Sequence, residues 1–195
     1  AAGAAPPKIM VMGALGRAGS GAVALCEAAG ITGDDLLKWD MAETAGGGPF
    51  DAIVDVDVFV NCIYLSKPIP PFVTLDMIES AAAPRLSVVC DVSCDTTNPH
   101  NPIPFANVNT TFDAPMTHVG SEARGVDIVT IDNLPSLLPR EASSEFSDAM
   151  LPFMVAWAAA AEAGAQLPPE WAASAGQYVK HRALADIATA GESAA

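Results

Sequence analysis

The sequence predicts an α/β fold, Rossmann-like and doubly wound, with a mostly parallel sheet and helices at the C-terminal end. Two patterns indicate it. Short apolar runs alternate with helical stretches along most of the chain. The first apolar run also leads directly into a glycine-rich turn, residues 13–21, which opens a helical pattern. This order of strand, turn and helix is typical of dinucleotide-binding folds.

Strands are expected where short apolar runs are continuous. These runs are residues 9–12, 36–40, 58–65, 86–92 and 126–131, with a less regular strand or hairpin around 107–119. The runs 58–65 and 86–92 lack a regular polar alternation, so we expect both strands to be buried on both faces of the sheet.

Helices are expected where apolar residues recur at a helical spacing. They are residues 17–29, which Gly30 ends, residues 74–82, which Thr74 caps, one helix capped by Ser143 or Ser144, and one after Pro168-Pro169. We accordingly divide the chain into a linker or processing remnant (1–7), a dinucleotide-binding domain (8–142) and a C-terminal helical segment (143–195).

The composition narrows the classes of function. The formal net charge is −14 and the 9 lysines and arginines are scattered, which argues against nucleic-acid binding. No apolar run approaches the roughly 20 residues of a membrane-spanning helix, so no membrane span is expected. The 4 cysteines form no CxxC pair, which favours a reducing, intracellular compartment, either the cytoplasm or an organelle.

The glycine-rich turn suits a dinucleotide because glycine permits tight turns and lets a pyrophosphate approach backbone N–H groups at a helix start. Arg17 in this turn is placed to neutralise the pyrophosphate. Asp40 ends the second expected strand, at the separation typical of the acidic residue that binds the adenosine ribose. A carboxylate there repels a 2′-phosphate and favours NAD over NADP. Plainer interpretations remain open. In these, the glycine-rich turn serves only helix packing, Arg17 is an ordinary surface residue, and Asp40 is a solvated strand end.

The loops after the two buried strands hold other reactive side chains. Lys67, Asp95 and His100 follow carboxyl ends of strands and are candidates for proton transfer, although residues of this kind more often stabilise a loop. A zinc site made of Cys90, Cys94 and His100 is a weak alternative, since Cys90 falls inside an apolar run and no fourth ligand is evident. We expect no metal.

Six blocks of the sequence carry a family resemblance. They are GALGRAGSGA, LLKWD, GGPFD, VNCIYLSKPIPPF, VVCDVSCDTTNPHNPIP and IDNLPSLLPREAS. In order and spacing they resemble the NAD-dependent, lysine-forming saccharopine dehydrogenases of the α-aminoadipate route to lysine, over residues 8–152. The resemblance implies an oxidoreductase that oxidises saccharopine, a secondary amine joining lysine to a glutarate unit, and passes hydride to NAD. Hydrolysis of the imine then gives lysine and 2-oxoglutarate.

The resemblance also assigns residues to the cofactor NAD. Those that would surround the pyrophosphate are Gly13, Gly16, Arg17, Gly19, Ser20 and Gly21. Asp40 would hold the adenosine ribose. Those that would line the rest of the cofactor cleft are Cys62, Ile63 and Tyr64, with Asp132 and Leu134 approaching the nicotinamide side.

In this family the proton-transferring lysine and histidine come from a first domain that precedes the glycine turn, and only seven residues precede Lys8 here. We therefore assign no catalytic residue. We expect a fragment or one chain of a split enzyme, inactive alone and acting on saccharopine only with a complementary domain or partner chain. Segment 143–195 would pack on that domain or partner. The alternative is a catalytically silent Rossmann domain recruited as a structural subunit of a larger assembly.

Overall fold

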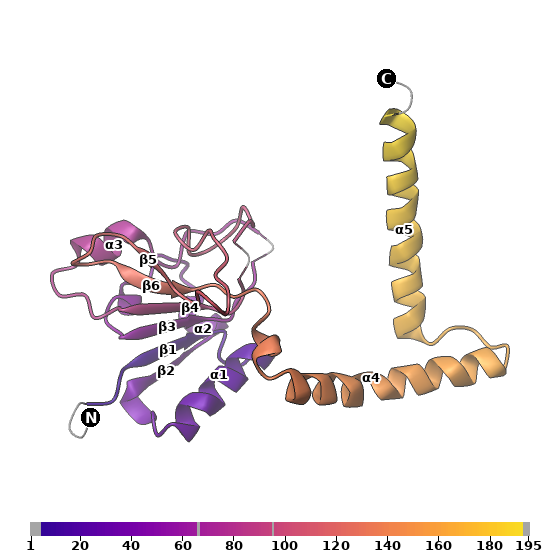
Figure 1. The fold of residues 1–195 in the computed structure, drawn as a ribbon, viewed down its shortest axis with the longest axis horizontal. Helices are drawn as coiled ribbons and strands as arrows, with labels where there is room; N and C mark the ends of the chain where they lie inside the picture. The colour runs from indigo at the N-terminus through magenta and orange to yellow at the C-terminus, as the bar shows by residue number, and fades with distance from the viewer. Residues whose placement is uncertain (1–4, 66, 95, 193–195) are drawn as a thin grey trace. The chain divides into compact units, whose positions relative to one another are not determined.

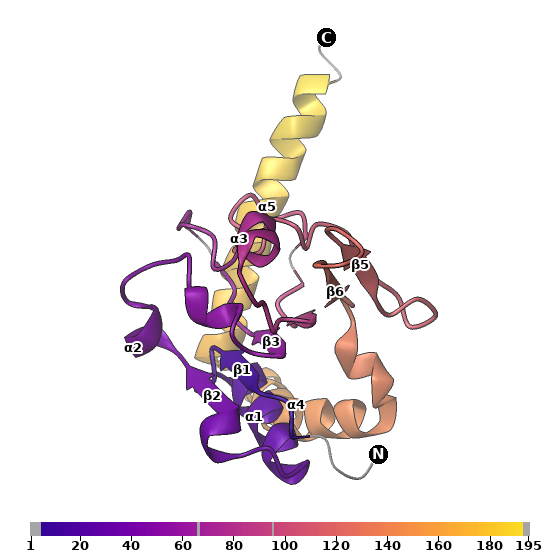
Figure 2. The ribbon, with the colours of Figure 1, turned by 90° about the vertical axis from the view of Figure 1, so that its left-hand side faces the viewer.

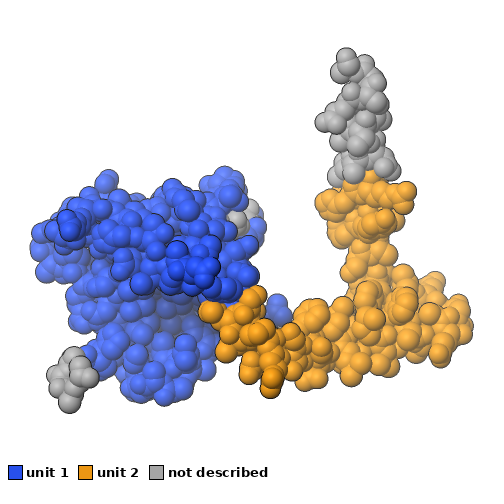
Figure 3. All heavy atoms as spheres, viewed as in Figure 1, with its two compact units in different colours: residues 1–134 blue, residues 135–195 orange. Residues whose placement is uncertain are grey.

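The computed structural model describes residues 5–65, 67–94 and 96–192. The chain forms two compact units, residues 1–134 and 135–195, which Figure 3 colours separately. The first unit holds the sheet and the shorter helices, and the second holds two long helices. From the sequence, this boundary was expected after Ala142, whereas the division into units falls after Leu134, since the first long helix begins earlier than expected.

Unit 1 is built on a six-stranded sheet with the order β2-β1-β3-β4-β6-β5 (Figure 1). The strands are β1 (Ile9–Met12), β2 (Leu36–Trp39), β3 (Val58–Asn61), β4 (Val88–Asp91), β5 (Thr117–Val119) and β6 (Val126–Val129). Only the pair β5 and β6 is antiparallel among the pairs of this described sheet. This confirms the predicted α/β class. Because β2 and β3 flank β1 on opposite sides, the sheet has a topological switch point between β1 and β3.

The α-helices of the described chain are α1 (Arg17–Ala28), α2 (Met41–Thr44), α3 (Leu75–Ser80), α4 (Pro139–Glu162) and α5 (Pro169–Glu192). Four of these helices lie where the sequence predicts them, one of them with an earlier start, and the short helix α2 was not expected. Thr74 caps α3 as expected, with its hydroxyl accepting from Met77 N at 3.3 Å. The expectation that Ser143 or Ser144 caps α4 is wrong. That helix begins at Pro139, whose fixed φ suits the first helical position.

The central strand β1 is buried on both faces, as a parallel sheet covered on two sides requires. Its side chains alternate: Val11 packs in one cluster with Cys26 of α1, and Met12 joins a larger core that includes Ile78 of α3. Figures 1 and 2 show α1 and α3 at the sheet in two perpendicular views. This packing holds α1 against one face of the sheet.

Four strands are shorter than the apolar runs that predicted them. β2 ends at Trp39 and not at residue 40, and β6 ends at Val129 and not at residue 131. β3 ends at Asn61, not at residue 65, and β4 begins and ends inside the expected range 86–92. The Asn61 Oδ1 accepts a hydrogen bond from Ile63 N at 3.2 Å, and this local bond turns the chain out of the sheet. The range 107–119 yields β5 and one isolated parallel bridge between Thr110 and Ile131.

Unit 2 consists of α4 and α5. The Trp171 Nε1 donates to Phe153 O at 2.9 Å, and the rings of Trp157 and Trp171 lie 6.3 Å apart between centroids. No residue of α4 is fully buried within the described part of the chain. Despite their length, neither these helices nor any other described helix is apolar enough to cross a membrane.

Candidate functional site

The glycine-rich turn is held at the carboxyl end of β1 by the neighbouring strand. The backbone N–H groups of Gly13 and Ala14 both donate to Trp39 O, at 2.8 and 3.0 Å. Gly13 has a φ of +84°, and a Cβ there would lie 3.0 Å from Ile63 Cγ1. Both the backbone conformation and the space therefore require glycine at this position.

Gly19 brings helix α1 against the turn. A Cβ on Gly19 would lie 1.9 Å from Gly13 O, so the helix approaches the turn more closely than any side chain permits. Gly16, at the N-cap, has a tighter than ordinary approach of 3.2 Å to the same oxygen. Gly21 differs, because no atom lies within 4 Å of the position of its Cβ. Gly13 and Gly19 are thus the glycines that the geometry needs most.

The N-terminus of α1 has the features of an anion site. No side chain caps it, and its first turn contains no acidic residue. The first backbone N–H groups of a helix without such partners bind a phosphate through hydrogen bonds and the helix dipole. Arg17 is exposed in this turn, and the Ser20 hydroxyl donates to Arg17 O at 3.0 Å. The arrangement can hold a pyrophosphate.

Asp40 lies beside this turn and caps α2. Its Oδ1 accepts from Met41 N and its Oδ2 accepts from Leu15 N, both at 2.9 Å. Its own N–H donates to Glu43 Oε2 at 2.8 Å, which completes a capping box. The capping box also has the Asp40 side chain accepting from the backbone N–H of Glu43, so three of the about four acceptor positions of the carboxylate are used and one remains. Asp40 can therefore accept from a hydroxyl group while it supports the turn.

The segment after β3 lies against the other side of the turn. Cys62 N donates to Met12 O at 2.9 Å, and Ile63 is the side chain closest to the Cβ position of Gly13. Tyr64 follows with 67% of its surface exposed. The structure thus brings Cys62 and Ile63 to the glycine-rich turn across the switch point of the sheet. Burial raises the pKa of the Cys62 thiol to about 11, so the thiol is protonated near neutral pH.

Sequence reasoning missed a buried polar pair at this edge. Asn61 and Asp91 end the paired strands β3 and β4, and Asn61 Nδ2 donates to Asp91 Oδ1 at 2.9 Å. Both side chains are almost fully buried. The available signal was a polar residue inside each apolar run, at the position where the strand ends.

The other expected site residues lie apart from the turn along the sheet. Asp132 and Leu134 follow β6, whose carboxyl end shares the sheet edge but which β3 and β4 separate from β1. Asp132 is exposed and Leu134 is half-buried. The sheet order therefore gives these two residues a place at the same edge but no contact with Gly13.

The three candidates for proton transfer lie in different surroundings. Asp95 lies outside the described residues. Lys67 is exposed, and His100 helps to line a cavity of about 350 Å³ formed by residues of 68–71 and 96–107. Asn98 supports this loop, donating to Leu65 O at 2.9 Å and accepting from His100 N at 2.9 Å. Among the described residues, no group of three or more His, Cys, Asp or Glu side chains is placed to hold a metal ion.

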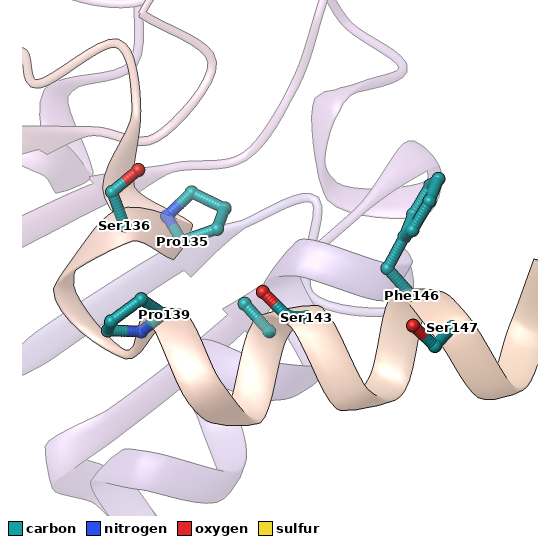
Figure 4. Close-up of a pocket in the computed structure, with 7 residues that line it drawn as sticks. Pro135, Ser136, Pro139, Ser143, Phe146 and Ser147 are labelled. Carbon is teal, nitrogen blue, oxygen red and sulfur yellow. The ribbon is translucent and has the colours of Figure 1, made fainter.

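A separate cavity of about 340 Å³ lies within unit 2, along the first turns of α4. Its lining, drawn in Figure 4, combines hydroxyls and one aromatic ring: Pro135, Ser136, Pro139, Ala142, Ser143, Phe146 and Ser147. Ser143 thus lines a cavity, whereas from the sequence Ser143 or Ser144 was expected to cap the helix.

Known proteins resemble this chain over most of its length. Residues 50–180 match the family described as alanine dehydrogenase/PNT, C-terminal domain. The chain is 47% identical over 181 residues to a saccharopine dehydrogenase (NAD(+), L-lysine-forming) of Yarrowia lipolytica, covering 90% of this chain and 46% of that protein. The protein of the same name from Schizosaccharomyces pombe is 54% identical over 158 residues, covering 77% of this chain and 41% of that protein. These matches confirm the resemblance predicted from the sequence blocks.

A more distant relative has a different name. The α-aminoadipic semialdehyde synthase of Bos taurus is 28% identical over 120 residues, covering 49% of this chain and 13% of that protein. The chain spans less than half the length of each of these three relatives.

Proposed function

This chain belongs to the family of alanine dehydrogenase/PNT C-terminal domains, and from that membership we propose that it is the NAD-binding part of a saccharopine dehydrogenase-like oxidoreductase. Its relatives of 47% and 54% identity are named as NAD(+)-dependent, lysine-forming saccharopine dehydrogenases. The proposed overall reaction converts saccharopine, NAD and water into lysine, 2-oxoglutarate and NADH.

One observation carries the cofactor assignment: Gly19 packs so closely on Gly13 that the uncapped start of α1 meets the carboxyl end of β1 at the switch point. A side chain at Gly19 would push α1 away from the turn, and one at Gly13 would meet Ile63 and Cys62, so both glycines keep the backbone of the turn close to the start of α1. The residues present therefore fit NAD. When bound, NAD supplies the hydride acceptor.

In this proposal each part of the cleft has its own task. The backbone of Gly13, Gly16, Gly19, Ser20 and Gly21, with the Arg17 guanidinium, borders the pyrophosphate. The remaining acceptor position of Asp40 binds the adenosine ribose, and its negative charge disfavours a 2′-phosphate. The segment Cys62, Ile63 and Tyr64 forms the opposite wall, and Asp132 and Leu134 lie toward the nicotinamide side.

The oxidation also needs groups that move protons. We assign none to this chain, and we propose that a complementary domain or partner chain supplies them together with the saccharopine pocket. The support is that the matched relatives are more than twice as long as the part aligned with this chain. The 195-residue chain is then expected to bind NADH and to leave saccharopine unchanged when alone.

A second candidate is a structural role in a larger assembly, with the dinucleotide fold kept but catalysis lost. Exposed apolar side chains on α4 favour it, since Phe146 and Leu151 are 68% and 60% exposed. Loss of NADH binding would favour this second candidate, whereas NADH binding is required by the first and is also compatible with the second.

Titration of NADH fluorescence with the full 195-residue chain tests the proposal. We expect saturable binding, weakened about ten-fold by Arg17→Gln because the positive charge in the first turn of α1 is lost. Lys180→Gln removes one positive charge from α5 and is the matched control, with unchanged affinity expected. No saturable change at about 1 mM NADH, roughly the weakest affinity expected for a cofactor site, would contradict the proposal.

A further inference from the structure

The buried polar pair next to the switch point has no role in the NAD site proposed above. Asn61 and Asp91 are partners in the register of β3 and β4 and are 0% and 2% exposed. Polar side chains are costly to bury among apolar neighbours unless hydrogen bonds satisfy them. Two apolar residues would fill the same place without that requirement, so the pair suggests a task other than core packing.

The two neighbours of Asn61 fix which way its amide points. The Ile63 N–H only donates, so the Asn61 atom facing it must be the acceptor Oδ1, which leaves Nδ2 to donate to Asp91 Oδ1. Asn61 Nδ2 must therefore face Asp91, at 2.9 Å, and Oδ1 must face Ile63 N, at 3.2 Å. Reversing the amide would lose the bond to Ile63 N. The Asn61 side chain thus connects β4 to the segment after β3 in a single orientation.

Residues 62–64, which follow β3 and which Asn61 holds, contact the glycine-rich turn. Ile63 Cγ1 lies 3.0 Å from the Cβ position of Gly13, and Cys62 N is bonded to Met12 O. The backbone of Asn61 also holds the residue that follows β4, because the Asn61 carbonyl accepts a hydrogen bond from Val92 N at 2.9 Å. A shift of Ile63 would change the distance between the glycine-rich turn and residues 62–64.

We infer that Asn61, oriented by Asp91, is a positioning residue for the dinucleotide: it sets the spacing between the glycine-rich turn and residues 62–64. This inference rests on the proposed NAD site. Neither side chain is assigned a contact with the cofactor, because both are buried and act through Ile63.

Asn61→Asp is the sharpest variant. A protonated carboxyl has the shape and the donor and acceptor groups of the amide, whereas an ionised carboxylate cannot donate to Asp91. Two adjacent buried carboxyls share a proton, so the variant regains the donor as the pH falls. The thiols of Cys62 and Cys90 also face this region, and burial raises the pKa of each, so both stay neutral.

We expect Asn61→Asp to bind NADH about ten-fold more weakly than the unchanged chain near pH 8 and to recover most of that affinity near pH 6. Circular dichroism at both pH values checks that each protein is folded. The control is Val126→Ala, a buried position at the amino end of β6, which lowers stability away from the cleft and is expected to leave NADH affinity unchanged.

A second readout needs no cofactor. Iodoacetamide labelling, mapped by mass spectrometry, is expected to modify Cys62 several-fold faster in Asn61→Ala than in the unchanged chain, with the buried Cys26 of α1 labelled at an unchanged rate. Unchanged Cys62 labelling, pH-independent affinity of Asn61→Asp, or an equal loss in Val126→Ala each overturns the inference. If the unchanged chain binds no NADH, the proposed function fails, and the labelling rates still decide the positioning role.

Discussion

The Asp40 carboxylate is bonded to the backbone of Leu15: Oδ2 accepts from Leu15 N at 2.9 Å, across 25 residues of sequence. The other oxygen accepts from Met41 N at the start of α2. The carboxylate thus joins the end of β2 to the glycine-rich turn. A residue interpreted from sequence as a ribose ligand is also a support for the backbone around the proposed pyrophosphate site.

Asp40→Asn is expected to weaken both roles. The amide keeps one acceptor oxygen, so either Leu15 N or Met41 N loses its partner, and stability falls by about 1 kcal/mol. Without the negative charge, NADH affinity falls roughly ten-fold while NADPH is rejected less strongly. Fluorescence titration with both nucleotides and thermal unfolding measure these changes. Asp34→Asn, at an exposed carboxylate, is the control. An unchanged ratio of the affinities for NADH and NADPH in Asp40→Asn contradicts the prediction.

Gly19→Ala and Gly21→Ala form a matched pair on α1. The first places a Cβ where only 1.9 Å separates it from Gly13 O, so α1 must move and stability falls by about 3 kcal/mol. The second meets no atom within 4 Å and replaces an exposed helical glycine, so stability rises by up to about 1 kcal/mol. Thermal unfolding of both variants and of the unchanged chain measures these changes in stability. Similar losses in both variants would contradict the close packing.

NADH titration of the same pair tests the turn itself. Gly19→Ala is expected to abolish binding, and Gly21→Ala to retain it, because the space at Gly21 is open. The backbone of Gly21 borders the pyrophosphate in the proposed site, and the added methyl group points into open space, so loss of affinity in a stable Gly21→Ala protein would mean that the cofactor occupies that space.

Much of the sheet was predictable because short apolar runs and the glycines that end them determine strands and turns from the local sequence. The run at residues 9–12 became β1 without change, and the turn after it lies where the pattern indicated. The ends of strands were less predictable. The apolar run through residue 65 conceals the end of β3, which depends on a side-chain hydrogen bond of Asn61 to Ile63 N rather than on hydrophobicity.

The residue types of the candidate site could be proposed from the sequence, whereas their arrangement in space could not. Gly13 and Asp40 follow from spacing alone, since a fingerprint of this kind is read along the chain. The partnership of Asn61 with Asp91 joins two strands and requires the register of the sheet. The start of α4 was misjudged because Pro139 competes with the serines as a start signal, and proline at the first helical position prevailed.

Asp57 is expected to make stability depend on acidic pH. The Arg85 guanidinium, bonded to Asp57 Oδ2 at 2.6 Å, lowers the pKa of this carboxyl, and the Lys8 N–H bonded at 2.7 Å lowers it further. A lowered pKa in the folded state adds stability above the unfolded pKa of about 3.9, and this stability is lost as the pH falls through the folded pKa.

Comparison of Asp57→Asn with the unchanged chain measures this contribution. At pH 7 we expect the variant to be less stable by no more than about 1 kcal/mol, since the ion pair is partly exposed. The difference should shrink as the pH falls below the unfolded pKa of about 3.9 and through the lower pKa of the folded state. Asp113→Asn, at an exposed loop position, serves as the control. A difference that persists at low pH would contradict the assignment.

Trp171→Phe is expected to loosen the helix pair of unit 2. Phenylalanine keeps an aromatic ring near Trp157 but loses the Nε1–H that donates to Phe153 O at 2.9 Å. One such bond contributes about 1 kcal/mol, which corresponds to roughly five-fold faster cleavage by a protease in the connection between α4 and α5. Tyr178→Phe removes a polar group from a side chain that is 65% exposed, and its cleavage rate should not change. Equal cleavage of all three proteins would mean that this bond does not hold α5 to α4.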